Sequence, residues 1–406
     1  MTMVRRAKMP TLQDLGVKNI APPAKRFLFV VPPLTGHINP TVAVGAELAR
    51  RGHEVAWAGH PEVVGPLLEP GSVLYPARDE ALADRLETAR AEWLGLRGPA
   101  ALRFLWEEFL VPLGHAMMPG VEAAIEAFRP DVVVTDQQAL AGAVAARRND
   151  LPWATSATTS AELTDPLAGV PKVADWVSGL LAGFQRPYGL EAFDLRFSDH
   201  LVLAFSTAAL IGDTSGFPDH YAFVGPALGR PSGGTGFPWE WLSGPAILVT
   251  LGTVNGAAGE RFFQVAADAV RDLDVQAVFV APDGVLIDAP PNVLVRPYVP
   301  QLALLPHLSA VVTHGGHNTV CETLAHGLPL VVAPIRDDQP VIAGQVEAAG
   351  AGVAVMFSRV QAPELREAIT QVLTGDAHRA AARRIRDSFV AAGGASAAAD
   401  HLEKLT

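Results

Sequence analysis

The sequence predicts an α/β protein with two domains, each built around its own parallel sheet. Short apolar segments of strand length alternate with helical segments in two separate series, a pattern typical of parallel strands joined by right-handed crossovers. A stretch rich in glycine and proline separates the two series. The 406 residues exceed what one small core needs, and 49% of them are hydrophobic, so two well-buried domains are expected.

The first series begins at Arg26. An apolar strand, a turn-rich loop and a helix ending at Gly52 are expected at residues 27–31, 32–40 and 41–51. Residues 78–128 have a mostly helical pattern, whereas residues 155–196 mix small residues, prolines and aromatics and predict loops and short helices. Further strands are expected at residues 54–58, 131–135, 201–204 and 221–224.

The second series follows a predicted linker. Glycine and proline cluster in residues 225–236, as in flexible connections. We therefore place an N-terminal domain at residues 27–225, a linker at 226–240 and a C-terminal domain at 241–384. Strands of the second domain are expected at residues 247–251, 276–281, 293–295, 310–313 and 330–333, and helices at 260–272, 363–373 and 377–391.

The ends and the overall charge exclude several classes of protein. Residues 1–26 are basic but lack the apolar core of a signal peptide, so we expect a flexible leader and a cytoplasmic location. There is no run of about 18 apolar residues that would span a membrane. A net charge of −11 argues against nucleic acid as a partner. The lone Cys321 excludes an intramolecular disulfide and a cysteine zinc cluster.

Residues 309–322 carry the strongest functional signal. An apolar strand leads into the turn Gly315-Gly316, and a helix is expected to begin near Asn318. The free N–H groups and positive dipole end of such a helix suit a phosphate or pyrophosphate. His314 can add a neutral or charged donor to the same anion, and Thr319 a hydroxyl.

Two further sets of polar residues lie near this predicted anion site. Glu322 is one helical turn beyond Asn318, on the same face, where a carboxylate can accept hydrogen bonds from a ribose diol. Asp338 and Gln339 follow the apolar strand 330–333 and offer groups suited to sugar hydroxyls. Together these residues predict a pocket for a nucleotide sugar.

The pattern His-Gly-Gly-x-Asn-Thr-x-x-Glu, followed by Gly327-x-Pro329, Pro334 and Asp338-Gln339, resembles the donor-binding signature of the UDP-glycosyltransferase superfamily. The resemblance implies the GT-B fold, in which two Rossmann-like domains face each other across a cleft. It also implies inversion at the anomeric carbon, no metal and no bound cofactor. In that family the last helix crosses back to the N-terminal domain, as residues 385–406 are then expected to do.

The same resemblance implies a catalytic pair. The segment Gly36-His37-Ile38-Asn39-Pro40 resembles the family loop that carries the general base, and Asp136 ends an apolar strand as the family's supporting aspartate does. From the residues alone, a packed or helix-capping histidine is the favoured interpretation of His37, and Asp136 is often only a helix cap at such a position. Imidazole suits proton removal near neutral pH, and a carboxylate on its other nitrogen fixes the tautomer.

Other donor contacts are expected in the C-terminal domain. Thr253 follows a strand that ends at Leu251-Gly252, although a plain strand-end turn explains it about as well. The segment Tyr298-Val299-Pro300-Gln301 resembles the family segment that holds the nucleobase. Tyr298 would stack on the base, the backbone of Val299 would read its edge, and Gln301 would contact the ribose. A packing role for Tyr298 remains open.

A metal site is not expected. His314 and His317 are three residues apart but have no third ligand at suitable spacing, and the glycines fit an anion better. Asp337-Asp338 is another possible carboxylate pair, but we assign Asp338 to sugar contact and Asp337 to solvent. The role of His317 is left open. A hydrolase is disfavoured because the sequence has no Gly-x-Ser-x-Gly elbow.

The resemblance therefore implies an inverting glycosyltransferase that moves a hexose to a hydroxyl of an apolar aglycone, such as a bacterial secondary metabolite. Asp338-Gln339 favours UDP-glucose as the donor, with a dTDP-deoxysugar as the alternative. A nucleotide-sugar 2-epimerase and a catalytically silent activating partner are the rival functions. A monomer or a homodimer is expected. The following aromatic residues either line the acceptor cleft or belong to the core: Trp93, Phe104, Trp106, Trp153, Trp176 and Phe184.

Overall fold

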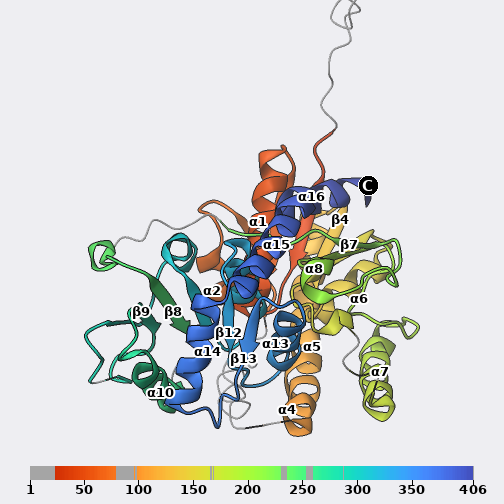
Figure 1. Ribbon diagram of the computed structural model, residues 1–406. Coiled ribbons are helices and arrows are strands. Elements are labelled where there is room, and N and C mark those ends of the chain that lie inside the picture. The colour runs from red at the N-terminus through yellow and green to blue at the C-terminus, as the bar shows by residue number, and fades with distance from the viewer. Residues whose placement is uncertain are drawn as a thin grey trace, which may run out of the picture.

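The computed structural model describes residues 23–78, 96, 98–164, 167, 169–229, 236–252, 259–286 and 288–405. It contains two parallel sheets, which confirms the predicted α/β architecture. In Figure 1 the first domain lies on the right and the second on the left.

The first sheet has the strand order β3-β2-β1-β4-β5-β6-β7. Its strands are β1 (Arg26–Val30), β2 (Glu54–Gly59), β3 (Val73–Pro76), β4 (Val132–Asp136), β5 (Trp153–Ala157), β6 (Leu201–Ala204) and β7 (Tyr221–Phe223). Its helices are α1 (Thr35–Arg50), α2 (Pro61–Val64), α4 (Pro99–Phe104), α5 (Val111–Phe128), α6 (Leu140–Arg148), α7 (Pro171–Gln185) and α8 (Ala208–Ile211).

The second sheet has the strand order β10-β9-β8-β11-β12-β13. Its strands are β8 (Ala246–Thr250), β9 (Gln276–Val280), β10 (Val293–Arg296), β11 (Ala310–Thr313), β12 (Leu330–Val332) and β13 (Gly352–Ala354). The helices of this half are α10 (Glu260–Val270), α11 (Gln301–Leu304), α12 (His317–Ala325), α13 (Gln339–Ala348), α14 (Ala362–Thr374), α15 (Asp376–Ala392) and α16 (Gly394–Leu402).

Three elements differ from the sequence-based expectations. The helix α1 begins at Thr35 rather than residue 41, so the predicted loop 32–40 is wrong over most of its length. The strand β5 (Trp153–Ala157) extends into residues 155–157, where loops were expected because the segment is only partly apolar. Hydrogen bonds to β4 and β6 on either side hold it as a strand. The helix α7 has 15 residues instead of the expected loops and short helices. Its buried Val177, Leu181 and Phe184 recur at helical spacing.

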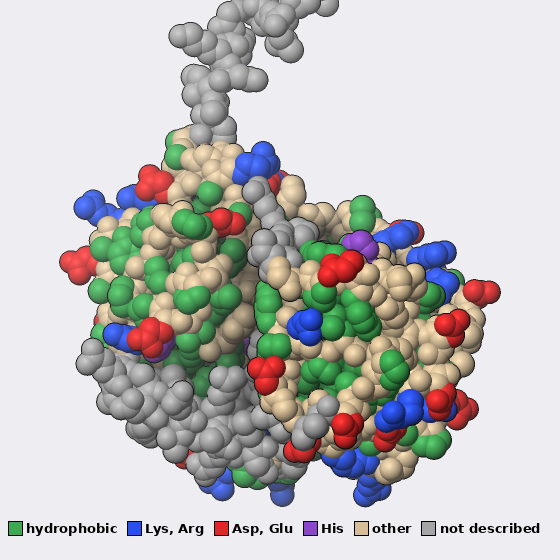
Figure 2. All heavy atoms as spheres, turned by 90° about the vertical axis from the view of Figure 1, so that its left-hand side faces the viewer, with side chains coloured by type: hydrophobic (Ala, Val, Ile, Leu, Met, Phe, Trp, Pro, Cys, Tyr) green, Lys and Arg blue, Asp and Glu red, His purple; other side chains and the backbone are tan. Residues whose placement is uncertain are grey.

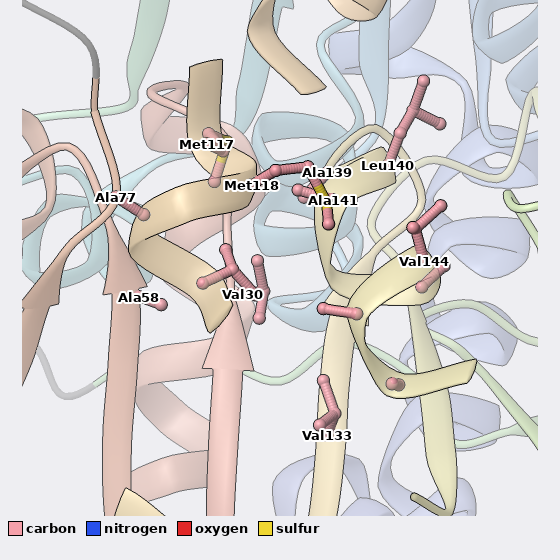
Figure 3. Packing of buried hydrophobic residues seen from close by; sticks show 14 of the residues in the cluster. Val30, Ala58, Ala77, Met117, Met118, Val133, Ala139, Leu140, Ala141 and Val144 are labelled. Atoms are coloured by element: carbon pink, nitrogen blue, oxygen red, sulfur yellow. The ribbon is translucent and has the colours of Figure 1, made fainter. Parts of the chain in front are cut away.

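The core of the first domain holds β4 and α6 in place. Met117 and Met118 of α5 pack beside Ala139 and Ala141, above the strands that carry Val30 and Val133 (Figure 3). Gly142 lies so close to the sheet that an added Cβ would overlap Thr135 Oγ1. The chain immediately after β4 is therefore tightly fixed, because packed interiors leave little room for adjustment.

The end of the chain joins the first domain. The helix α16 lies beside α1, and α15 leads to it from the second domain (Figure 1). Ala398, Ala399 and Leu402 are fully buried in one apolar cluster with Phe27 and Phe29 of β1. At the edge of this cluster, Arg51 forms ion pairs with Asp400 and Glu403 at 2.6 and 3.0 Å.

The surface agrees with the charge of the sequence. On the face shown in Figure 2, the basic and acidic side chains of the described residues are interspersed rather than gathered into one basic area. Among the helices of the described ranges, none combines the length and the apolar character that a membrane span requires.

Candidate active site

His37 and Asp136 meet at the carboxyl edge of the first sheet. His37 lies in the first turn of α1, directly after β1, and Asp136 is the last residue of β4. The strands β1 and β4 are hydrogen-bonded neighbours, so the two side chains converge. His37 Nδ1 lies 2.9 Å from Asp136 Oδ1 and 3.0 Å from Oδ2. The carboxylate is fully buried, whereas the His37 side chain keeps 17% of its surface exposed.

Thr158 completes this pair and has no counterpart in the sequence-based prediction. Its hydroxyl donates to Asp136 Oδ2 at 2.9 Å, and its oxygen lies 2.8 Å from His37 Nδ1. The backbone N–H of Gln138 donates to Asp136 Oδ1 at 2.8 Å. Because acceptor oxygens of both residues surround Nδ1, the proton belongs on that nitrogen. Nε2 then carries the free lone pair, as a general base requires.

The environment of His37 favours its protonated form. Burial works against the charge, but the charge and hydrogen bond of Asp136 favour it, with further contributions from the charges of Asp338 and Glu162. The net effect is a raised pKa for His37. A base with a raised pKa accepts a proton more readily, and the carboxylate of Asp136 stabilises the imidazolium that results.

The second domain places its glycine turn opposite this pair. Gly315 has φ of 92°, a left-handed conformation that glycine adopts without strain. The ring of His314 lies against two other glycines: an added Cβ on Gly252 or Gly316 would approach it to 2.7 or 2.8 Å. The turn leads directly into α12, whose first N–H groups are therefore available to an anion.

His314 is a neutral donor in this arrangement. Burial lowers the pKa of His314 to about 4, with the charge of Asp338 opposing and that of Arg336 reinforcing the shift. At pH 7 the imidazole is thus uncharged. The positive potential at the turn comes from the N-terminus of α12, and Thr319, which is half-buried, lies in the first turn of that helix.

Two predicted donor-site residues form hydrogen bonds across the boundary between the domains. Asn318 Nδ2 donates to the backbone oxygen of Gly36 at 2.8 Å. That oxygen has no partner within α1, because the residue four positions on is Pro40, which lacks an N–H. Asp338 Oδ2 accepts from Thr159 Oγ1 at 2.7 Å. The turn that carries His37 is thereby joined to the helix of the predicted anion site.

Glu322 and Gln301, both predicted to contact ribose, lie together. Gln301 Nε2 donates to Glu322 Oε2 at 2.5 Å. Burial raises the pKa of Glu322, and the hydrogen bond from Gln301 opposes that change. The pair therefore presents one fixed carboxylate, with Glu322 Oε1 on the side away from that bond.

Gln339 stabilises the turn before its own helix. Its Oε1 accepts from the backbone N–H groups of Ile335 and Arg336 at 2.9 and 3.1 Å. The amide Nε2 is left to donate to a ligand, beside the carboxylate of Asp338.

The segment predicted to hold a nucleobase presents an open ring. Tyr298 is 72% exposed, so its ring is not part of the core and the packing alternative is not supported. The neighbouring Val299 is buried and fixes the backbone next to the ring. Thr253, the remaining predicted donor residue, lies outside the described residues.

His317 and Cys321 belong to the contact between the domains. His317 is buried, with Nδ1 at 3.4 Å from Ser160 Oγ and Nε2 at 3.3 Å from the backbone oxygen of Phe205. Cys321 lies one turn further along α12, 3.4 Å from His317 Nε2, and burial raises the pKa of its thiol. His317, whose role the sequence left open, is thus a packing residue at the domain boundary.

Most of the predicted acceptor-cleft aromatics are core residues. Phe104, Trp106, Trp153 and Phe184 are buried, and three of them belong to the main apolar cluster of the first domain. Trp176 is partly exposed, and its Nε1 donates to Glu107 Oε1 at 3.2 Å. Trp93 lies outside the described residues.

Comparison with known proteins finds relatives over most of the chain. Residues 265–405 match the family model of the erythromycin biosynthesis protein CIII-like C-terminal domain. The chain is 31% identical to 4'-demethylrebeccamycin synthase of Lentzea aerocolonigenes, over 94% of this chain and 99% of that protein. It is 30% identical to demethyllactenocin mycarosyltransferase of Streptomyces fradiae, over 93% and 86%.

A solved structure shows the same fold. The glycotransferase of kitacinnamycin superposes with a TM-score of 0.78 at 26% identity, over 95% of this chain and 100% of that one. Sequence identity at this level over almost the full length, together with the shared fold, identifies the family. This chain belongs to the UDP-glycosyltransferase superfamily and is a glycosyltransferase of the GT-B fold, similar to enzymes of macrolide and other natural-product biosynthesis.

Proposed function

We propose that the protein transfers a hexose, with inversion, from a nucleoside diphosphate sugar to a hydroxyl of an apolar natural-product aglycone. One observation carries this proposal: His37, held through Nδ1 by Asp136, lies on a turn that is hydrogen-bonded to the first helical turn of α12. A base for the acceptor and a cradle for the leaving diphosphate are then parts of one site.

The proposed reaction is a single displacement. His37 Nε2 takes the proton of the acceptor hydroxyl as the acceptor oxygen forms a bond to the anomeric carbon. The bond between that carbon and the diphosphate oxygen breaks with its electron pair, so the nucleoside diphosphate leaves. Its charge is received by the N–H groups at the start of α12, by neutral His314 and by Thr319, without a metal in this proposal. Attack opposite the leaving group inverts the anomeric centre.

We further propose UDP-glucose as the donor. Asp338 supplies a carboxylate that accepts hydrogen bonds from sugar hydroxyls, and Gln339 Nε2 supplies a donor. A sugar rich in hydroxyls satisfies both groups better than a deoxysugar does. Competing titrations with UDP and dTDP, followed by turnover with UDP-glucose and with a dTDP-deoxysugar, test this choice. Tighter dTDP binding with deoxysugar turnover would establish the alternative donor.

The activity itself is tested by release of UDP from UDP-glucose with and without a panel of aglycones. We expect release that depends on the acceptor, with one glycoside formed for each UDP. Release without an acceptor, together with an isomerised sugar, would instead identify a nucleotide-sugar 2-epimerase. Binding of the sugar nucleotide without turnover for any acceptor would identify a silent partner of another transferase.

Glu322→Ala should weaken nucleotide binding. A charged hydrogen bond to a ribose hydroxyl contributes about 1–3 kcal/mol, which corresponds to about 5- to 150-fold in Kd. Calorimetric titration with UDP measures the change, and Glu364→Ala on the distant helix α14 is the matched control. Equal UDP affinities for wild type and Glu322→Ala would remove Glu322 from the ribose site.

The rate should depend on pH through His37. As a base, His37 must be unprotonated, so kcat/KM is lost as the pH falls through its pKa. Since that pKa is raised, we expect the midpoint of the acid limb above 6.5, the ordinary value for histidine. The pH profile of kcat/KM under acceptor-limited conditions measures it. A midpoint below 6.5 would show that another group controls the limb.

A further inference from the structure

A second polar cluster lies beside the catalytic pair, and the mechanism above assigns neither of its residues to a substrate. Gln137 directly follows Asp136, and only 1% of its surface is exposed. Glu162 begins a short helical turn after β5. Within the described residues, neither amide atom of Gln137 nor Glu162 Oε2 forms a close hydrogen bond, although the amide of Gln137 lies near the Glu162 carboxyl group. A buried polar group without a partner lowers the stability of the fold by about 1–3 kcal/mol. A ligand that forms hydrogen bonds with these atoms would recover that free energy, so the cluster is a candidate binding site.

The cluster is close to the base. Burial raises the pKa of Glu162, whereas Arg196, the amides of Gln137 and Gln138, and the charge of His37 lower it. Gln138 itself holds Asp136 through its backbone N–H. Glu162, in the first domain, is thus close enough to His37 for their charges to interact, as is Asp338 in the second. In the proposed reaction the first domain is the side of the acceptor.

The charge of Glu162 decides what kind of group it accepts. Arg196 Nη1 lies 3.8 Å from Glu162 Oε2, which offsets part of the charge without a close hydrogen bond. The same guanidinium forms two shorter bonds to Asp194, at 2.9 and 2.8 Å. Glu162 Oε2 therefore still needs a hydrogen-bond donor, which a neutral hydroxyl provides.

We propose that Gln137 and Glu162 form an acceptor subsite for a second hydroxyl of the aglycone, next to the hydroxyl that His37 deprotonates. Glu162 Oε2 accepts the hydrogen bond of that second hydroxyl, and the Gln137 amide donates to its oxygen. The preferred acceptors are therefore diols rather than isolated alcohols or phenols. This subsite rests on the proposed function, since it selects among acceptors of the same transfer.

The test compares an aromatic aglycone that has two adjacent hydroxyls with the analogue that lacks one of them. For wild type we expect kcat/KM to favour the dihydroxy acceptor by about 10- to 100-fold, the size of one or two hydrogen bonds to a fixed site. Glu162→Leu and Gln137→Leu should each lower the value for the dihydroxy acceptor toward that of the analogue. The value for the analogue should stay nearly constant.

Further variants distinguish this subsite from a purely structural role of the two residues. Glu162→Gln keeps an acceptor oxygen and should restore part of the preference, whereas Glu126→Gln on the exposed side of α5 should change nothing. Equal losses for both acceptors would indicate a structural role, and an unchanged preference in both leucine variants would overturn the subsite. Absence of wild-type transfer to every aglycone would instead contradict the proposed function.

Discussion

His37→Ala should lower the rate of transfer by about 10²- to 10⁴-fold, the usual contribution of a positioned general base. The acceptor proton then has only water to receive it. Nucleotide binding should stay nearly intact, because the described contacts of the His37 ring are to Asp136 and Thr158 in the first domain. The fall therefore belongs in kcat, with little change in the Kd for UDP.

The measurement pairs steady-state transfer rates with calorimetric titration of UDP. His307→Ala, which removes an exposed histidine of the second domain, is the matched control and should leave both quantities unchanged. If His37→Ala weakens UDP binding as much as it slows transfer, His37 is a donor-site residue and the base must be sought elsewhere.

Asp136→Asn should be almost as damaging, although it changes only one atom. The backbone N–H of Gln138 requires an oxygen at the Oδ1 position, so the new amide nitrogen takes the place of Oδ2. That nitrogen then faces His37 Nδ1 and Thr158 Oγ1, 3.0 and 2.9 Å from the present Oδ2. Because an amide N–H donates, it competes with the acceptor Oδ1, which lies 2.9 Å from Nδ1, and shifts the proton toward Nε2. The tautomer with a free Nε2 is disfavoured, and the carboxylate charge that stabilises the imidazolium is removed.

We expect kcat to fall by about 10²- to 10⁴-fold, since a base in the wrong tautomer is equivalent to no base. Nitrogen-15 NMR of histidine-labelled protein reports the tautomer directly and should show protonated Nε2 in the variant. Thr158→Val, which keeps the shape of Thr158 but removes its hydroxyl, should cost less because Asp136 remains. Full activity of Asp136→Asn would show that the carboxylate only caps the following turn.

The fold was predictable because its signals are local. The strands β1, β4 and β8 are short apolar runs, and parallel strands buried on both faces have that composition. The strand β5 carries Thr155 and Ser156, and its pairing with β4 and β6 rather than its own composition makes it a strand. The start of α1 was missed because Pro40 suggests a loop, whereas near the start of a helix the missing N–H leaves only one carbonyl without a partner.

The site was predictable only where a residue follows a strand or belongs to the glycine turn. His37 and Asp136 both lie at carboxyl ends of neighbouring strands, so the topology brings them together. Thr158, Gln137 and Glu162 give no such signal, because hydroxyl and amide side chains near strand ends are common. The backbone bonds of Gln339 Oε1, and the bond from Asn318 to Gly36, depend on tertiary placement that no local pattern encodes.

The position of α16 has a consequence for how the protein folds during its synthesis. Ala398, Ala399 and Leu402 fill the same apolar cluster as Phe27 and Phe29, so the lobe that is synthesised first lacks part of its interior until residues 398–402 have been added. Folding of that lobe during translation therefore stays incomplete until this late segment has left the ribosome.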